Sequence, residues 1–571
     1  MSHSEFVHGN AFYRTIDALS DELASLFEAG DIESVLGRIQ AFVRAVDSDR
    51  RAVAKVFADP VLDEWCQRIG ATVAALPELS SPAQEPERAD CVILATELYR
   101  AGGHSAVIGD LVRTGRFGPR TVLLLTDTLD SADPVISAER FGPLVESEIA
   151  PAGSLLEKLR WTFMQLLVLR PRRLILFNHH YDSVAIAAAQ PGVADEIVFY
   201  HHGDHQLCLG VTLTHTLHVD PHALGFHHCR AAHGLTKNVF WPLIVDDLGA
   251  PRPFTNRRTA LRTCSSGSSN KFELDYKYKY VDLVPRLLAC TGGTHVHIGP
   301  LSGGALRQLY SGLDALLVPH DRFVHIPWVQ SVWRALQQQR IDVYLTSFPL
   351  GGGRAAIEVM GAGIPMIGHS CYVSSFYGGQ DMLYPEAFLW ETPDQLLSHV
   401  GCIDFQQLER ESHQARAHYE QHHTASALER AIDAGIEAPP PLPLRPQRSD
   451  PMQSFLDDVH YSLRDHLTAA EIAPVFEQLK QERAALSEQR EREQGALVAR
   501  AVEVEALSRI HADGTMALME AYTREIAQLR QEVARLRAQE VDAKDRLARI
   551  ERSRSWRLAR FAQRAAAVLR G

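Results

Sequence analysis

The sequence lacks the features that would direct it into a membrane or out of the cell. It begins MSHSEFVHGN, with no basic start followed by an apolar core, and no apolar run approaches the roughly 20 residues of a membrane span. Its eight cysteines are scattered and form no C-x-x-C pair. We therefore expect a cytoplasmic protein with reduced, mostly buried cysteines.

Basic charge is also scarce. The chain has 58 Lys and Arg against 70 Asp and Glu, a net charge of -12. This balance argues against a nucleic-acid binder driven by bulk charge, so no nucleic-acid partner is expected. The G-x-x-x-x-G-K-[ST] loop of P-loop proteins is absent as well.

Length and periodicity divide the chain into several domains. With 571 residues it is too long for one core. Residues 1–85 carry apolar residues at three- and four-residue spacing, which predicts an all-α N-terminal domain. Residues 86–253 and 254–436 each alternate strand and helix patterns, with the Pro/Arg-rich stretch APRPFTNRR between them. This organisation predicts an α/β fold of two Rossmann-like domains facing a cleft.

Ten short apolar segments are the predicted strands. Those of the first block are Cys91–Thr96, Thr121–Leu125, Leu174–Phe177, Glu196–Tyr200 and Leu217–Val219. Those of the second block are Ala260–Thr263, His295–Ile298, Ala315–Val318, Ile341–Leu345 and Met366–Ile367. In open α/β sheets ligands bind where the strands end, so the loops that directly follow strands are the candidate sites.

The C-terminal part has a different composition. Residues 437–448, EAPPPLPLRPQR, predict a semi-rigid proline-rich linker. Residues 449–552 are rich in Ala, Glu, Arg, Gln and Leu, and residues 519–550 show a heptad pattern that predicts a coiled coil and a homo-oligomer. The alternative is a long helix packed on the globular body. The heptad positions are Met519, Tyr522, Ile526, Leu529, Val533, Leu536, Glu540, Ala543, Leu547 and Ile550.

The tail, residues 553–571, combines arginines with Trp556 and Phe561. A basic amphipathic helix with an aromatic anchor can lie on an anionic membrane, which would give peripheral contact at the inner face of the membrane. A capping helix is the equal alternative, and the sequence leaves both open.

The most informative loop contains three consecutive glycines, Gly351, Gly352 and Gly353. It joins the predicted strand Ile341–Leu345 to a predicted helix that starts at Arg354. Glycines let backbone N–H groups approach a phosphate, and a helix N-terminus favours negative charge. Glu358, one turn into the helix, can accept hydrogen bonds from sugar or ribose hydroxyls. An ordinary turn of a parallel sheet is the alternative.

A polar loop, CSSGSSNKFELDY, spans residues 264–276 and follows the first strand of the second block. Ser266 and Gly267 belong to its run of hydroxyl and backbone donors, and Lys271 adds a point charge. The loop has the composition of a diphosphate cradle. The alternative, a polar surface loop, is weaker because the same domain carries the glycine loop.

Two loops of the first block also follow strands. Gly102 and Gly103 form a tight loop, and His104 opens the next helix, which suits a backbone approach to a ligand. Asp182 lies in the segment NHHYDS after the strand Leu174–Phe177. A βα turn with a solvated histidine is the alternative reading of the first loop.

A third loop, YHHGDHQLCLG at residues 200–210, crowds four polar side chains together: His201, His202, Asp204 and His205. A histidine can act as a general base near neutral pH and an aspartate can orient it, so His205 with Asp204 is the candidate base. A metal site is the minor alternative, because the spacings match no standard zinc pattern and neighbours on an extended chain point apart.

In this order, the GGH loop, the strand-end histidines, the S-G-S-S-N-K loop and the G-G-G-R-A-A-I-E segment resemble a GT-B glycosyltransferase. Over residues 50–400 the likeness is to the bacterial cytoplasmic N-glycosyltransferases of adhesins and to O-GlcNAc transferases, and the adhesin enzymes also carry a helical domain before the core. The resemblance implies an acceptor-binding first domain and a nucleotide-sugar-binding second domain. The SRSWRL tail after a coiled coil resembles bacterial glycosyltransferases that build surface polysaccharides.

The resemblance also implies roles for individual residues. Donor-binding residues would be Ser266, Gly267, Lys271, Gly351, Gly352, Gly353, Arg354 and Glu358. The acceptor side would be Gly102, Gly103, His104, Asp182 and His202, with His205 and Asp204 as catalytic residues. In this assignment Lys271 binds the diphosphate, and Glu358 falls where the family has a ribose-binding acid, usually Asp.

Two departures from the pattern bear on mechanism. Many retaining GT-B enzymes carry two glutamates eight positions apart, and here the earlier position is Leu350, which favours inversion. The D-x-D metal motif of the other main glycosyltransferase fold occurs only as Asp47-Ser48-Asp49, in the N-terminal helical part, where we predict surface charge. No metal or other cofactor is therefore expected.

Together these features predict an inverting, metal-independent hexosyl- or N-acetylhexosaminyl-transferase. Its partners would be a nucleotide sugar, UDP-linked by preference, and a protein or surface-glycan acceptor. One alternative is a nucleotide-sugar 2-epimerase, which needs no acceptor. Another is a non-catalytic coiled-coil scaffold with a GT-B core, against which the intact Lys271, glycine loop and Glu358 argue. The sequence does not name the sugar or choose the acceptor.

Overall fold

The computed structural model describes residues 16–49, 52, 54, 56–79, 88–100, 103–142, 144–249, 251, 260–274, 276–446, 450, 453–454, 457, parts of 489–500, and 516–552. These residues belong to two units, Met1–Asp457 and Asp458–Gly571. None of the helices in this described part combines the length and hydropathy that crossing a lipid bilayer requires.

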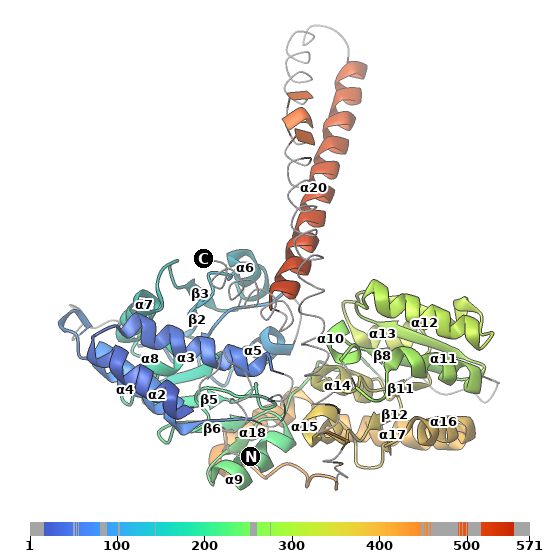
Figure 1. Ribbon diagram of the computed structural model, residues 1–571, viewed down its shortest axis with the longest axis horizontal. Helices are drawn as coiled ribbons and strands as arrows, with labels where there is room; N and C mark the ends of the chain where they lie inside the picture. Colours follow the sequence, from blue (N-terminus) through green and yellow to red (C-terminus); the bar gives the residue numbers. More distant parts are fainter. Residues whose placement is uncertain are drawn as a thin grey trace, which may run out of the picture. The chain divides into compact units, whose positions relative to one another are not determined.

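Seven parallel strands form the first sheet, in the order β3-β2-β1-β4-β5-β6-β7 (Figure 1). The strands are β1 Cys91–Ala95, β2 Thr121–Leu125, β3 Glu146–Ile149, β4 Arg173–Phe177, β5 Glu196–Tyr200, β6 Leu217–Asp220 and β7 Val239–Phe240. The helices of this domain are α5 Gly103–Arg113, α6 Pro134–Phe141, α7 Leu155–Leu169, α8 Ser183–Ala188 and α9 Ala223–His233. The central strands β1 and β2 are buried along their whole length, as expected for a parallel sheet covered on both faces.

Six parallel strands form the second sheet, in the order β10-β9-β8-β11-β12-β13. They are β8 Arg262–Ser266, β9 Thr294–Ile298, β10 Phe323–Ile326, β11 Val343–Leu345, β12 Met366–His369 and β13 Phe388–Trp390. The helices are α10 Ser269–Phe272, α11 Tyr280–Thr291, α12 Gly303–Ala315, α13 Val332–Gln338, α14 Gly353–Gly361, α15 Ser375–Gly378, α16 Pro393–Cys402, α17 Phe405–His422 and α18 Ala425–Ala434. Short 3-10 turns η2 His320–Arg322 and η3 Gln380–Met382 complete the domain. Helix α18 and the turn η4 Gly435–Glu437 instead lie against the first domain, where Arg116 pairs with Glu429 and Asp433 and η4 contacts β7.

Both sheets have the same topology. The strand order reverses between β1 and β4 in the first sheet and between β8 and β11 in the second. Ligands of such sheets bind at this reversal, outside the carboxyl ends of the strands. The observed architecture confirms the predicted pair of Rossmann-like domains, the arrangement of the GT-B fold.

Three N-terminal helices lie beside the first domain (Figure 1): α2 Ile16–Glu28, α3 Ile32–Asp47 and α4 Pro60–Ala74, followed by the turn η1 Pro77–Leu79. Helices α3 and α4 pack on α7 and α8. Asp31 and Asp59 cap α3 and α4 by accepting from backbone N–H groups. Leu36 and Ile69 share one core with Leu94 of the sheet. The predicted N-terminal helices are therefore present, and they bury their apolar faces against the α/β domain.

One predicted strand is wrong. The segment Ala315–Val318 was predicted as a strand, but helix α12 ends at Ala315 and residues 316–318 turn away from it. The strand that occupies this position in the sheet is β10. Leu317 has a positive φ of 54° and is 92% exposed, so the apolar run cannot continue as a buried strand. The prediction also missed β3, β7 and β13, which are short or lie at the edges of the sheets.

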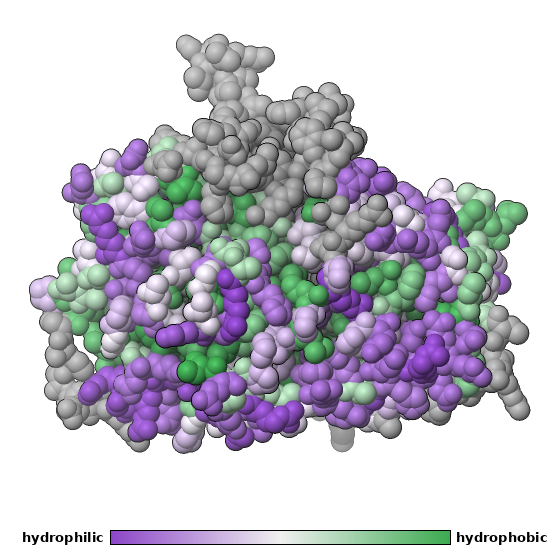
Figure 2. All heavy atoms as spheres, turned by 90° about the horizontal axis from the view of Figure 1, so that it is seen from below, coloured by the Kyte–Doolittle hydropathy of each residue, from purple (hydrophilic) through white to green (hydrophobic). Residues whose placement is uncertain are grey.

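On the face shown in Figure 2, purple hydrophilic residues predominate and green hydrophobic residues lie between them in small groups. The large hydrophobic side chains that remain exposed, such as Leu317 and Trp328, come from separate segments. Most of the apolar surface of the α/β part is thus gathered into its cores.

In the second unit, α20 Met516–Arg552 is one helix of 37 residues. Its heptad positions Ile526, Leu529, Val533 and Leu536 are partly shielded, whereas most residues between them are exposed. Arg500 forms an ion pair with Glu525 at 3.5 Å. The helix is confirmed; the coiled-coil pairing and the homo-oligomer stay predictions, and the tail 553–571 lies outside the described residues.

Candidate functional site

A cavity of about 360 Å³ lies where the carboxyl edges of the two sheets meet. The predicted residues that line it from the first domain are Gly103, His104, His202, Asp204 and His205. Those from the second domain are Lys271, Gly351, Gly353 and Arg354. Residues that the sequence scattered over some 250 positions are thus brought to one cleft, and Gly102 lies outside the described residues.

Lys271 is the positive charge of the second-domain wall. It lies on α10, directly after β8, and its Nζ donates to the Gly351 carbonyl at 3.1 Å. Burial lowers the pKa of this lysine, and among the described residues no carboxylate pairs with it within 4.0 Å. The ammonium is partly buried and has no counter-charge among the described residues, so a bound anion would stabilise it.

The glycine loop places the start of α14 beside this lysine. The N-cap Gly352 has no side chain to bond the first N–H groups of the helix, which leaves them open to a ligand. A Cβ at Gly352 would lie 2.9 Å from Lys271 Nζ, and one at Gly351 would lie 2.6 Å from Gly379 Cα. Close packing therefore requires glycine at position 351, where the neighbour is backbone, whereas at position 352 the neighbour is the end of a flexible lysine side chain that can move.

Asp204 is the buried acid of the first-domain wall, and it lies between two histidines. Its Oδ2 is 3.0 Å from His222 Nδ1, and its Oδ1 is 3.7 Å from His205 Nδ1. Burial acts to raise the pKa of Asp204, but the His222 and His205 imidazoles outweigh it and hold the pKa below its usual range. Burial likewise opposes the charge of His222, yet Asp204 raises the pKa of His222 to about 9. The side chain of His205 is 44% exposed and reaches the cavity, as a general base must.

Further imidazoles line the same wall. His104 Nε2 donates to the Phe177 carbonyl at 3.2 Å, and His202 Nε2 donates to the Asn178 carbonyl at 2.6 Å. Burial holds the pKa of His104 well below its usual value and lowers that of His202 to about 3. Both rings are therefore neutral, and His104 Nδ1 is a buried acceptor with no partner in the described structure.

Four predicted site residues lie behind the cavity wall. Ser266 Oγ bonds the Tyr344 hydroxyl at 2.6 Å, and a Cβ at Gly267 would lie 3.1 Å from Lys271 Cδ. Asp182 caps α8 and accepts from Thr96 Oγ1 at 2.7 Å. These three shape the strand ends. Glu358 Oε2 accepts from Ser331 Oγ at 3.1 Å and from the Trp333 N–H at 2.9 Å, which caps α13.

Arg354 lines the cavity, but its guanidinium is bound by residues of the first domain. Its Nη1 donates to the Ile244 carbonyl at 2.9 Å and forms an ion pair with Asp110 of α5. Because Arg354 lies in the first turn of α14, this pair ties the second-domain wall of the cavity to the first domain.

The interpretation of Asp47-Ser48-Asp49 as surface charge is wrong. Asp49 is 5% exposed, and the Asp47 side chain is 10% exposed and forms an ion pair with His180. The reason is that α3, which ends at Asp47, packs on α7 and α8 beside the carboxyl edge of the first sheet rather than standing in solvent.

Sequence reasoning missed two residues of the cavity. His222 follows β6 as the pair Pro221-His222, and Asp381 lies in η3, with its Oδ2 accepting from the Leu224 N–H at 3.2 Å. The strand-end rule applied to the predicted strand Leu217–Val219 could have found His222. Nothing in the local sequence identifies Asp381, which reaches the site through the packing of one domain on the other.

No protein-family model matches the chain, and no curated protein sequence is significantly similar to it. Among solved structures, the lipopolysaccharide outer core galactosyltransferase WaaB aligns at 16% identity and a TM-score of 0.46, over 61% of this chain and 98% of that one. HepE of Anabaena, in complex with UDP and glucose, aligns at 14% identity and a TM-score of 0.44, over 61% of this chain and 100% of that one. An O-GlcNAc transferase mutant of Thermobaculum terrenum aligns at 11% identity and a TM-score of 0.43, over 74% of this chain and 84% of that one. With identities and TM-scores this low, the chemistry of the site rests on this chain's own residues.

Proposed function

We propose that this chain is an inverting, metal-independent glycosyltransferase that moves a sugar from a UDP-linked donor to a protein or surface-glycan acceptor. The observation that carries the proposal is the uncompensated Lys271 ammonium beside the uncapped start of α14, at the cleft between two Rossmann-like domains. A diphosphate supplies the negative charge that this site is missing.

The same groups account for the leaving group. When the bond between the sugar and the diphosphate breaks, negative charge grows on the phosphate oxygens. Lys271 and the N–H groups at the α14 N-terminus are already in place to bind that charge. In this proposal they take the role that a divalent cation has in other transferases, so catalysis does not need one.

His205 is the proposed base. Its ring faces the cavity, and Asp204 stabilises the imidazolium that forms when the acceptor loses its proton. The acceptor enters from the first-domain wall, with Gly103, His104 and His202, and the donor diphosphate lies on the opposite wall. Attack from the side opposite the leaving group inverts the anomeric carbon. Leu350 lines the cavity where a retaining enzyme of this fold would have a glutamate, which supports inversion.

Two other functions make different predictions. A 2-epimerase would convert the donor without an acceptor, and it has no need of a helical extension such as α20. A scaffold would need no donor, whereas the lysine, the glycine loop and the helix start are all in place here. Product analysis with donor alone separates the epimerase from the transferase. Truncation at the linker 437–448 separates the scaffold, since a transferase core retains donor hydrolysis without residues 449–571.

Calorimetric titration with UDP, GDP, CMP, dTDP and their sugars tests the donor site. We expect UDP or a UDP-sugar to bind, with unchanged affinity when Mg²⁺ or Mn²⁺ is added after chelation. Lys271→Ala should weaken binding by about 10- to 100-fold, and Lys277→Ala, an exposed lysine of the same domain, should leave it unchanged. Failure of every nucleotide to bind at millimolar concentration would refute the donor site.

A further inference from the structure

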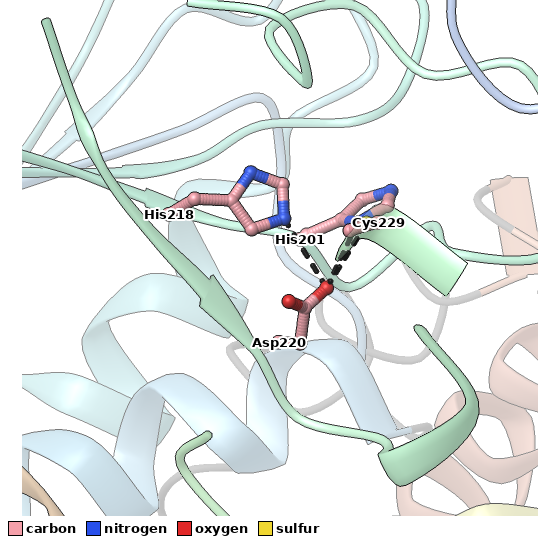
Figure 3. Close-up of side chains that lie close together, drawn as sticks. All are labelled: His201, His218, Asp220 and Cys229. Carbon is pink, nitrogen blue, oxygen red and sulfur yellow. Dashed lines mark hydrogen bonds and ion pairs between the residues drawn. The ribbon is translucent and has the colours of Figure 1, made fainter. Parts of the chain in front are cut away.

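A second group of polar side chains lies outside the cavity, in the core of the first domain. It consists of His201, His218, Asp220 and Cys229 (Figure 3). They come from the end of β5, from β6 and from α9, and their exposed fractions are 2%, 4%, 0% and 0%. His201 and His202 are neighbours on the chain, but His202 lines the cavity and His201 belongs to this group. The proposed transferase chemistry uses none of the four.

The separations within the group match those around one metal ion. Asp220 Oδ1 lies 3.2 Å from His201 Nδ1, 3.2 Å from His218 Nε2 and 3.5 Å from Cys229 Sγ. Cys229 Sγ is also 3.5 Å from His201 Nδ1, and all four ligand atoms lie within 4.8 Å of one another. Tetrahedral Zn²⁺ with bonds of roughly 2.0–2.3 Å separates its ligand atoms by roughly 3.3–3.8 Å. Bringing these four atoms onto an ion therefore needs only small movements.

The backbone explains why the four side chains converge. His218 and Asp220 are two positions apart on β6, so they lie on the same face of the sheet. The His201 N–H bonds the Val219 carbonyl and sets the end of β5 beside them. Helix α9 follows β6 after a two-residue turn and places Cys229 over the same face.

The carboxylate is held in one orientation by its neighbours. Asp220 Oδ2 accepts from Asn238 Nδ2 at 2.7 Å, and Arg230 Nε donates to Asn238 Oδ1 at 2.6 Å. This leaves Oδ1 directed at the two imidazoles and the thiol (Figure 3). Outer partners of this kind orient the ligands in metal sites.

Charge favours a divalent cation of the zinc class. Two neutral imidazoles, the Asp220 carboxylate and a Cys229 thiolate together carry two negative charges, which one such cation neutralises inside the core. Without it, Asp220 is a fully buried acid. A mixed set of imidazole, thiolate and carboxylate ligands suits Zn²⁺ better than Mg²⁺ or Ca²⁺.

We propose that His201, His218, Asp220 and Cys229 bind one structural Zn²⁺. Four protein ligands fill a tetrahedral sphere and leave no position for a substrate, so the ion holds structure and does no chemistry. It would join β5, β6 and α9, the helix whose N-cap is His222 of the cavity. The ion would thus support the first-domain wall while transfer itself stays independent of added metal.

Metal analysis of the full-length protein, purified with any affinity tag removed, tests the proposal. We expect one zinc per chain, and a fall in the melting temperature on chelation that added Zn²⁺ reverses. Replacement by Co²⁺ should give a sulfur-to-metal charge-transfer absorption. Absence of bound zinc together with no response to chelation would show that hydrogen bonds alone close the group.

Matched variants assign the ligands. Cys229→Ser should lose the Co²⁺ absorption and the response to chelation, and Cys264→Ser, an equally buried cysteine of the second sheet, should retain both. Asn238→Ala should keep the absorption but weaken metal affinity by about 10- to 100-fold, because it frees the Asp220 carboxylate. An absorption that persists in Cys229→Ser would place the metal elsewhere, for example at exposed Cys290 or Cys402, and would overturn the proposal. If Cys229→Ser fails to fold, the measurements on the wild-type protein and on Asn238→Ala still decide.

Discussion

The two α/β domains have the same strand order at their core but opposite chemistry at the edges that meet in the cleft. The first edge presents imidazoles and an acid: His104, His202, Asp204 and His205. The second presents glycines and a lysine that pairs with no carboxylate of the described residues: Gly351, Gly353 and Lys271. The first can move a proton, and the second can hold a polyanion. In the proposed function, the fold supplies the two edges and their side chains divide the work of the transfer reaction.

The largest effect on the transfer rate is expected from a substitution of the proposed base in the first-domain edge. His205→Gln should lower the transfer rate at saturating donor by about 10²- to 10⁴-fold, because a positioned base contributes about that much. Its affinity for UDP should stay within about twofold, since the second edge is intact. Steady-state rates and calorimetry measure the two effects, with the exposed His320→Gln as control. A near-normal rate in His205→Gln with a large loss in His104→Gln would move the base to His104.

The next largest effect is expected on the affinity for UDP, from a substitution of Lys271 in the second-domain edge. Lys271→Ala should weaken binding of UDP by about 10- to 100-fold, because a charge-assisted hydrogen bond to phosphate contributes roughly 1.5–3 kcal/mol. Inorganic pyrophosphate should lose affinity in parallel, since the lysine faces the phosphates. Competition binding of both ligands measures this. Equal affinities in wild type and Lys271→Ala would show that the lysine has a purely structural role.

The pH dependence of UDP binding is a further test of the edge that carries Lys271. Burial lowers the pKa of Lys271 from 10.5, so its charge is lost at a lower pH than that of an exposed lysine. The charged form binds the anion, and UDP affinity should therefore fall as pH rises, by about tenfold per unit above the pKa. Lys271→Arg should give a flat profile over pH 7 to 10, because arginine does not titrate there. A wild-type profile as flat as that of the arginine variant would contradict the assignment.

The smallest effect is expected at Glu358, which is partly exposed but does not line the cavity. Glu358→Ala should weaken UDP binding by about 5- to 10-fold and leave pyrophosphate binding unchanged, because only UDP carries a ribose. It should also lower the free energy of unfolding by about 1 kcal/mol through the lost cap of α13. Ser331→Ala removes a hydroxyl that bonds Glu358 but not the carboxylate, so it separates the two effects. If both variants bind UDP normally, Glu358 only caps the helix.

Several features of the site could be predicted from the sequence because they depend on local rules. A glycine loop between strand and helix, and histidines directly after strands, follow from backbone geometry and from the carboxyl-edge rule. This is why Lys271, the Gly351–Gly353 loop and the His202–His205 segment were found. The apolar run Ala315–Val318 was wrongly predicted as a strand, because a pattern of four residues does not distinguish the end of a helix from a strand.

Other features depend on contacts between distant segments. Asp381 and Asp47 reach the two edges only through the packing of helices from other parts of the chain. The group of His201, His218, Asp220 and Cys229 matches no short motif, since its members come from three elements that meet only when β5 pairs with β6 and α9 covers them.

By itself, the sequence determined the class of fold, the loops that follow each strand and the residues able to bind an anion or accept a proton, because these depend on spacing along one segment. Only the tertiary structure decided which of those residues share one cavity, which lie behind its wall as Glu358 and Asp182 do, and which imidazole faces the cleft or the core. The physical reason is that burial, charge pairing and ligand distances are set between segments, and no local pattern contains them.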